Sequence, residues 1–216
     1  MRNAVIISGG RIEEDFALSF LKKKRYDHII AADRGLLFLH HHHILPSHIV
    51  GDFDSASAAV LEPYQGSETI AIRRFRPEKD WTDTEIAVEQ ALELGCGTID
   101  ILGGTGSRMD HMFANLQVLA LALERGADCR LVDSHNMVYM RDRQFTVRRS
   151  DQWGTFLSLF AYGGDVTGLT LRGVKYPVKH FTLGTAGSRG VSNEITAETA
   201  EIDFETGKLL VMETKD

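Results

Sequence analysis

Short apolar runs alternate with segments of helical periodicity over about the first 140 residues. Two of these segments predict helices: one begins with a Thr-x-x-Glu capping pattern at Thr82 and ends at Gly95, and the other covers Asp110–Arg125. Runs rich in β-branched residues predict strands at Ala4–Ser8, His28–Ala32, His48–Gly51, Thr69–Ile72, Ile99–Leu102 and Arg130–Val132. This alternation predicts an α/β domain with a doubly wound, mostly parallel sheet and flanking helices.

The pattern changes after residue 140, where threonine and glycine become frequent and helical periodicity is absent. Gly-containing turns separate runs that predict strands at Gly154–Phe160, Val166–Leu171, Val178–Leu183 and Glu201–Phe204. We therefore expect a C-terminal all-β sandwich, with domains at residues 1–142 and 143–216.

Composition and charge narrow the class of protein. With 216 residues, 43% hydrophobic and 25% charged, the chain has the composition of a folded globular protein. Its net charge of −6 offers no basic surface, so neither nucleic acid nor a membrane is expected as a partner. The apolar run Ala4–Ile7 is too short for a signal sequence, which favours a cytoplasmic location.

Polar and glycine-rich loops follow the predicted strands of the first domain, at the sheet edge where open α/β folds bind ligands. They are Ser8–Arg11, Ala32–Gly35, Gly51–Ser55, Lys79–Asp83 and Gly103–His111. Their glycines allow close backbone approach, and Arg108 beside a helix N-terminus suits phosphate. Asp52 and Asp54 point the same way in an extended segment, so we expect a shared Mg²⁺. Together the loops predict a metal and polyphosphate site.

Each loop also has a structural explanation, since Asp and Gly are ordinary turn residues and Asp83 or Asp110 could serve a helix N-terminus. What favours function is that six aspartates map to one edge of the sheet: Asp33, Asp52, Asp54, Asp80, Asp83 and Asp110. The chain has no P-loop motif and no complete dinucleotide fingerprint, which disfavours P-loop kinases and Rossmann dehydrogenases.

The tract His40–His43 raises a second metal hypothesis. Four consecutive histidines cannot all face one ion on a helix, so the sequence favours a solvated helix end over a specific metal site.

In their order along the chain, these loops resemble the thiamine pyrophosphokinase (thiamine diphosphokinase) family, which makes thiamine diphosphate from thiamine and ATP. The motifs that carry the resemblance are Ala-Asp-x-Gly at 32–35, Gly-Asp-Phe-Asp-Ser at 51–55, Lys-Asp-x-Thr-Asp-x-Glu at 79–85, Gly-x-x-Gly-x-Arg-x-Asp-His at 103–111 with Asn115, and the segments 173–177 and 190–194. The sequence departs from the family at Arg34 and Ser107, where glycine is usual.

The resemblance implies an ATP-binding catalytic domain, a thiamine-binding and dimerisation sandwich, and a homodimer with active sites between subunits. It implies Mg²⁺ as cofactor, and thiamine and ATP as substrates. The candidate catalytic residues are Asp52, Asp54, Asp80, Asp83, Arg108 and Asp110, of which Asp52, Asp54, Asp80 and Asp83 are the candidate metal ligands. The candidate ATP contacts are Gly9, Gly10, Asp33, Lys79, Arg108 and His111, and the candidate thiamine contacts are Tyr176, Ser192 and Asn193.

The implied reaction is attack of the thiamine hydroxyl on the β-phosphorus of ATP, with AMP as the leaving group. Arg108 and Mg²⁺ would spread the charge that develops on the bridging oxygen, and Asp80 or Asp83 would orient or deprotonate the hydroxyl. Clustered carboxylates also serve metal-dependent phosphohydrolases and nucleotidyltransferases, which is the alternative enzymatic hypothesis. A non-catalytic thiamine-binding protein is the third hypothesis, although it would not need four metal-facing aspartates.

Overall fold

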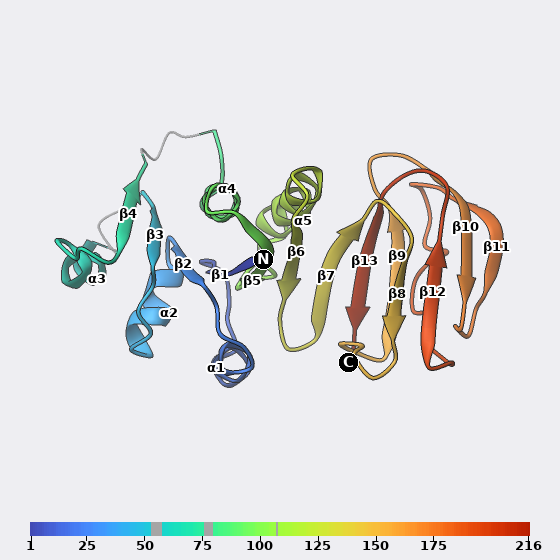
Figure 1. Ribbon diagram of the computed structural model, residues 1–216, viewed down its shortest axis with the longest axis horizontal. Coiled ribbons are helices and arrows are strands. Elements are labelled where there is room, and N and C mark those ends of the chain that lie inside the picture. Colours follow the sequence, from blue (N-terminus) through green and yellow to red (C-terminus); the bar gives the residue numbers. More distant parts are fainter. Residues whose placement is uncertain (53–57, 76–79, 107) are drawn as a thin grey trace. The chain divides into compact units, whose positions relative to one another are not determined.

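The computed structural model describes residues 1–52, 58–75, 80–106 and 108–216 (Figure 1). The chain divides into two compact units, Met1–Ser134 and His135–Asp216. The division precedes the boundary expected at residue 142, because strand β7 (Asn136–Arg141) pairs with β13 (Leu209–Thr214) of the second unit.

The first unit is built on a parallel sheet of strand order β4-β3-β2-β1-β5-β6. Its strands are β1 (Arg2–Ile7), β2 (His28–Ala32), β3 (His48–Gly51), β4 (Ala71–Arg74), β5 (Cys96–Leu102) and β6 (Asp128–Val132). The chain adds strands outward from β1 as far as β4 and then returns to the other side of β1 with β5. The order therefore reverses between β1 and β5, which is where doubly wound sheets open a ligand crevice.

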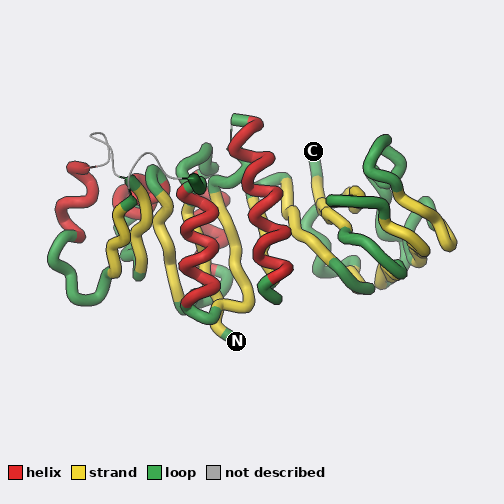
Figure 2. Tube along the Cα trace, turned by 90° about the horizontal axis from the view of Figure 1, so that it is seen from above, coloured by secondary structure: helices red, strands yellow, loops and turns green. Residues whose placement is uncertain are grey.

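Helices cover both faces of this sheet, as predicted. They are α1 (Glu14–Lys22), α2 (Gly35–His41), α3 (Ala58–Leu61), the short 3₁₀ helix η1 (Glu62–Tyr64), α4 (Asp83–Glu93) and α5 (Met109–Glu124). Figure 2 shows α4 and α5 together in front of the strands, and α1 and α2 lie on the opposite face. Because both faces are covered, β1 is apolar without alternation, and Ala4–Ile7 are fully buried. No helix in the described ranges is long and apolar enough to span a membrane.

A charged network is buried in the middle of this sheet. The side chain of Asp100, in β5, is fully buried. Its carboxylate accepts hydrogen bonds from the Tyr26 hydroxyl at 2.7 Å and from Arg130 Nε at 2.8 Å, and it pairs with Lys24 Nζ at 2.8 Å. The cations on neighbouring segments thereby neutralise a charge that apolar surroundings alone would not tolerate.

The second unit is the predicted β-sandwich. One sheet holds β7, β13 and β9 (Phe156–Ala161), and the other has the order β11-β10-β12-β8, with β8 (Phe145–Arg148), β10 (Val166–Arg172), β11 (Val178–Leu183) and β12 (Thr199–Asp203). All the pairings between these strands are antiparallel. Side chains from both sheets form one apolar core that includes Leu159, Leu169, Ile202 and Val211.

Candidate active site

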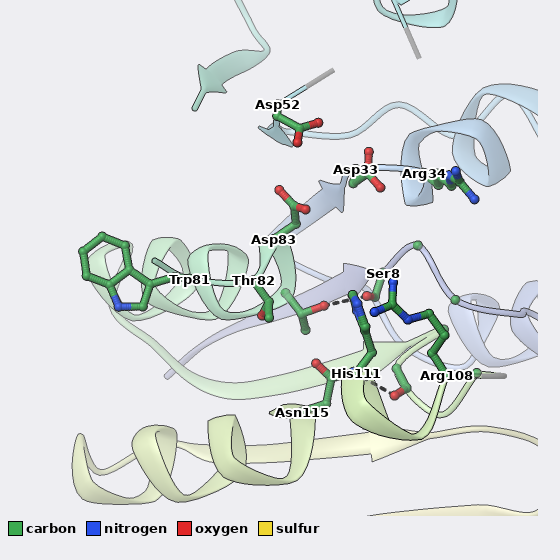
Figure 3. Close-up of a pocket in the computed structure, with 16 residues that line it drawn as sticks. Ser8, Asp33, Arg34, Asp52, Trp81, Thr82, Asp83, Arg108, His111 and Asn115 are labelled. Carbon is green, nitrogen blue, oxygen red and sulfur yellow. Dashed lines mark hydrogen bonds between the residues drawn. The ribbon is translucent and has the colours of Figure 1, made fainter. Parts of the chain in front are cut away.

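A cavity of about 470 Å³ opens in the first unit where the strand order reverses. Figure 3 shows the side chains around it. They come from the loops that follow β1, β2, β3 and β5, from the residues just before α4, and from the first turns of α4 and α5, with Asn115 one turn further along α5. The lining residues are Ser8, Gly9, Gly10, Asp33, Arg34, Asp52, Trp81, Thr82, Asp83, Thr84, Gly103, Gly104, Gly106, Arg108, His111 and Asn115.

Two glycine loops form the floor of the crevice and contact each other directly. The Gly10 N–H donates to the Gly103 carbonyl at 3.1 Å, and the Ser8 N–H donates to the Leu102 carbonyl at 2.8 Å. A Cβ at Gly10 would lie 2.3 Å from the Gly103 oxygen, and Gly103 itself has a φ of 72°. Only glycine fits this packing, so exposed backbone, rather than side chains, faces the cavity here.

Three carboxylates meet on one side of the cavity. In Figure 3, Asp83 at the start of α4 points toward the space beside Asp33 and Asp52. Burial raises the pKa of Asp33, and the negative charges of Asp83 and Asp52 raise it further, against a lowering by a backbone hydrogen bond at Arg34. Asp33 also has a φ of 48°, a left-handed conformation that Asp tolerates better than most residues. The structure therefore concentrates negative charge that a cation would relieve.

The first turn of α4 holds Asp83 in place. Thr82 caps the helix by accepting from the Glu85 N–H at 3.2 Å, as the sequence predicts. Thr84, two residues after Thr82, is buried and shares a 2.6 Å hydrogen bond with the Ser8 hydroxyl at the end of β1. Asp83 thus lies between two anchored residues, which limits where its carboxylate can go.

The N-terminus of α5 supplies the cationic side of the cavity. Arg108 contacts Asp110 through two hydrogen bonds, Nη2 to Oδ2 at 2.6 Å and Nε to Oδ1 at 3.1 Å. The Asp110 carboxylate also accepts from the His111 backbone N–H at 2.9 Å. The Arg108 hydrogen bonds, with that backbone bond, lower the pKa of Asp110 to about 2. Both side chains are exposed, so the pair is a surface contact that orients Arg108.

Carboxylate oxygens are suitable ligands for Mg²⁺. The spacing of Asp33, Asp52 and Asp83 suits an ion held partly by water and phosphate better than an ion enclosed by protein ligands alone. In the part of the chain that the structure describes, only Glu14, His41 and His42 bring three ligand atoms within 4.8 Å of one another. Asp33, Asp52 and Asp83 are therefore more widely spaced. Mg²⁺ commonly takes one or two carboxylates and completes its shell with water and substrate phosphates. The residues present fit that mode of binding.

The structure brings together most of the residues predicted for the nucleotide. Gly9, Gly10, Asp33, Asp52, Asp83, Arg108 and His111 all line the cavity. Asp80 is exposed and Asp110 faces Arg108, and neither lines it. The predicted metal ligand Asp54 and the predicted ATP contact Lys79 lie outside the described residues.

Sequence reasoning placed Ser8 and Trp81 in loops of the predicted site but gave them no individual role. It gave Thr84 no role, and it named Asn115 only as part of a family motif. Asn115 is buried, and its Nδ2 donates to the Gly104 carbonyl at 2.8 Å, which fixes the second glycine loop. Its place one turn after His111 on the apolar side of α5 is the signal that could have identified it, since a buried amide needs a hydrogen-bonding partner.

The residues predicted to contact thiamine lie in the second unit. The Tyr176 side chain is exposed, whereas Asn193 is buried. The Asn193 Oδ1 accepts from the backbone N–H groups of Tyr176 and Glu194, both at 3.0 Å, and its Nδ2 donates to the Tyr176 carbonyl at 3.0 Å. Ser192 has a φ of 57° and donates its N–H to the Ser158 hydroxyl at 3.0 Å. The Asn193 amide is therefore engaged in holding the Tyr176 loop.

Comparisons with known proteins agree with the resemblance seen in the sequence. The family model "Thiamin pyrophosphokinase, catalytic domain" matches residues 21–131, and "Thiamin pyrophosphokinase, vitamin B1 binding domain" matches residues 143–210. A thiamine pyrophosphokinase of Bacillus subtilis is 31% identical over 189 residues, which cover 87% of either chain.

Solved structures lead to the same family. The crystal structure of thiamine pyrophosphokinase from Bacillus subtilis matches with a TM-score of 0.86 and 26% identity, covering 100% of both chains. That of thiamin pyrophosphokinase from Geobacillus thermodenitrificans matches with a TM-score of 0.83 and 28% identity, covering 100% of this chain and 98% of that one. The chain therefore belongs to the thiamin pyrophosphokinase family.

Proposed function

We propose that the cavity between the β1 and β5 loops is the active site for the family's reaction, in which the diphosphoryl group of ATP passes to the hydroxyl of thiamine and AMP leaves. The observation that carries this proposal is the division of charge within one cavity. Asp33, Asp52 and Asp83 lie on one side, and Arg108 with the N-terminus of α5 lies on the other. A magnesium-bound triphosphate carries a cation and anionic phosphates, so its binding site needs both negative and positive side chains.

The glycine loops are suited to the phosphate chain. The backbone of Gly9 and Gly10 faces the cavity without side chains, so phosphate oxygens can approach it closely. The Nε and Nη2 of the exposed Arg108 guanidinium donate to Asp110, and its other N–H groups can donate to phosphate oxygens. These residues would orient the β-phosphorus for in-line attack and spread the charge that develops toward AMP.

Asp52 and Asp83, with Asp33 beside them, would hold the metal ion through carboxylate oxygens. When bound, Mg²⁺ supplies charge neutralisation at the phosphate oxygens. For the hydroxyl proton of thiamine, Asp83 is the stronger candidate of the two aspartates considered, because it lines the cavity and Asp80 does not.

The second unit is proposed to bind the thiamine ring system, because residues 143–210 match the vitamin B1 binding domain. Tyr176 offers an exposed aromatic face for a cationic, aromatic substrate. A homodimer with active sites between subunits and a cytoplasmic location complete the proposal, and both stay predictions from the family resemblance.

The test is incubation of the protein with thiamine, ATP and Mg²⁺, followed by mass spectrometry that separates AMP from ADP. Thiamine-dependent AMP with equimolar thiamine diphosphate would support the proposal. Phosphate or diphosphate release without thiamine would reject it in favour of a phosphohydrolase.

Two variants locate the reaction in this cavity. Asp52→Asn and Asp83→Asn should each lower turnover by about 10²-fold or more while the fold stays intact, because each removes a charge from the cluster. The matched control is Asp142→Asn, whose carboxylate contacts Arg143 in the second unit and does not line this cavity. Wild-type turnover in both cavity variants would reject the site.

A further inference from the structure

The histidine tract at the end of α2 forms a cluster with the first turn of α1. Glu14, His41 and His42 each offer one ligand atom, and these three atoms lie within 4.8 Å of one another. The His42 Nε2 is 3.6 Å from Glu14 Oε2. The cluster borders a hollow of about 430 Å³ that is separate from the cavity proposed for ATP and shares no lining residue with it.

The backbone separates the four histidines into different roles. The Ile44 N–H donates to the Leu39 carbonyl at 2.9 Å, and the His43 N–H donates to the His40 carbonyl at 3.2 Å. With His43 at a φ of 53°, this is the Schellman ending of a helix. His40, His41 and His42 all line the hollow, but the Nδ1 of His40 already contacts the Tyr64 hydroxyl at 3.1 Å.

The His42 ring is held in place but its Nε2 is left without a hydrogen bond. The ring packs against Phe38, with centroids 4.7 Å apart, and its side chain is only 15% exposed. Its Nε2 is buried and has no hydrogen-bond partner among the described residues, and Glu14 Oε2, at 3.6 Å, is beyond hydrogen-bonding distance. A buried ring nitrogen without a partner costs free energy, and an ion between it and Glu14 would supply the missing interaction.

We propose that Glu14, His41 and His42 bind a Zn²⁺ ion that ties the start of α1 to the end of α2. Two imidazoles and one carboxylate, with water in the fourth position, suit Zn²⁺ and exclude Mg²⁺, which prefers oxygen ligands alone. Bonds of about 2.0–2.2 Å in a tetrahedron place ligand atoms about 3.4 Å apart. The His42 and Glu14 atoms are close to that spacing, and the exposed side chains of Glu14 and His41 can adjust.

The ion would connect two helices that both follow loops of the ATP cavity. The loop before α1 contains Gly9 and Gly10, and α2 begins directly after Asp33 and Arg34. We therefore expect Zn²⁺ binding to raise the melting temperature of the first unit. The binding site itself does not depend on the proposed function, because none of its three ligands lines the ATP cavity.

The experiment is isothermal titration of the untagged full chain with ZnCl₂ in excess Mg²⁺, which occupies the aspartate cluster of the cavity. We expect one Zn²⁺ per chain. Glu14→Gln, His41→Gln and His42→Gln should each weaken Zn²⁺ binding by about 10–100-fold or more. Loss of a side chain that only supports a metal ligand already weakens metal binding by that factor. Co²⁺ in place of Zn²⁺ should give the visible absorption of a four-coordinate ion, and that absorption should be lost in the same variants.

His43→Asn is the matched control, because Asn tolerates the left-handed conformation and His43 is not a ligand. It should keep wild-type affinity. The proposal is overturned if no Zn²⁺ binds in the presence of Mg²⁺, if any one of the three ligand variants binds as tightly as the wild type, or if His43→Asn loses binding to the same extent. Thiamine-dependent turnover without Zn²⁺ should be unchanged in all four variants and reports that they are folded.

Discussion

Asp100→Asn should destabilise the first unit strongly although the residue lies outside the cavity. The substitution keeps the shape of the side chain and removes the carboxylate charge that contacts Tyr26, Lys24 and Arg130. Breaking a buried ion pair by removing one partner costs about 3–5 kcal/mol. Because Arg130 and Lys24 are 24% and 36% exposed, solvent screens part of the loss, and we take about 3 kcal/mol.

At about 2–4 °C per kcal/mol for a protein of this size, that loss lowers the melting temperature of the first unit by about 6–12 °C. Differential scanning calorimetry of the full chain measures it, with tryptophan fluorescence as a second probe. The control is Glu93→Gln, which breaks the exposed pair of Glu93 with Arg73 and should shift the melting temperature by less than about 3 °C. Equal shifts in the two variants would refute the claim that burial makes the Asp100 network important.

Three further predictions follow from single residues. Asp33→Asn should melt at a higher temperature than the wild type at neutral pH without metal, and yet turn over more slowly. The raised pKa of Asp33 means that ionisation costs the folded state stability as the pH rises above 3.8, so the gain should vanish in calorimetry below that pH. Burial and the negative charge of Asp100 raise the pKa of Tyr26 above its usual 10.0, so stability should fall as the pH rises past 10.0. Tyr26→Phe should flatten this decline, and an unchanged alkaline slope would contradict the assignment. Asn193→Ala should raise the KM for thiamine by about 5–150-fold with a smaller effect on the KM for ATP, since losing the bonds that hold the Tyr176 loop costs about 1–3 kcal/mol. An unchanged KM for thiamine would mean that this loop does not bind it.

The strands of the first unit could be predicted because parallel strands covered on both faces leave continuous apolar runs. The prediction of Thr69–Ile72 instead of Ala71–Arg74 shows the limit: β4 is at the sheet edge, largely exposed, and ends in two arginines. The sequence analysis did not predict β8, and it did not predict β13 or β7 either, although both of these contain valine, which favours strands. Strands β7 and β13 pair with each other across a long stretch of chain, for example Leu210 with Met140.

For the candidate site, residue types and loops could be predicted, but the partner of each side chain could not. The family resemblance made Asp110 a candidate catalytic residue, and only the structure shows that its carboxylate holds Arg108. The resemblance likewise made Asn193 a candidate thiamine contact, and the structure shows its amide engaged with the Tyr176 backbone. A side chain's hydrogen bonds depend on segments that a one-dimensional pattern does not bring together.

The electrostatics of the cavity bear on the form in which the nucleotide enters. Burial and the charges of Asp52 and Asp83 already disfavour ionisation of Asp33, so adding the negative charge of free ATP on this side would increase the same repulsion. A divalent cation carried by the triphosphate reverses the sign of that interaction, because each carboxylate then faces a positive charge. The cationic side, with Arg108 at the start of α5, can attract phosphates without metal. In the proposed site, the aspartates would therefore favour binding of a metal-bound nucleotide over a metal-free one.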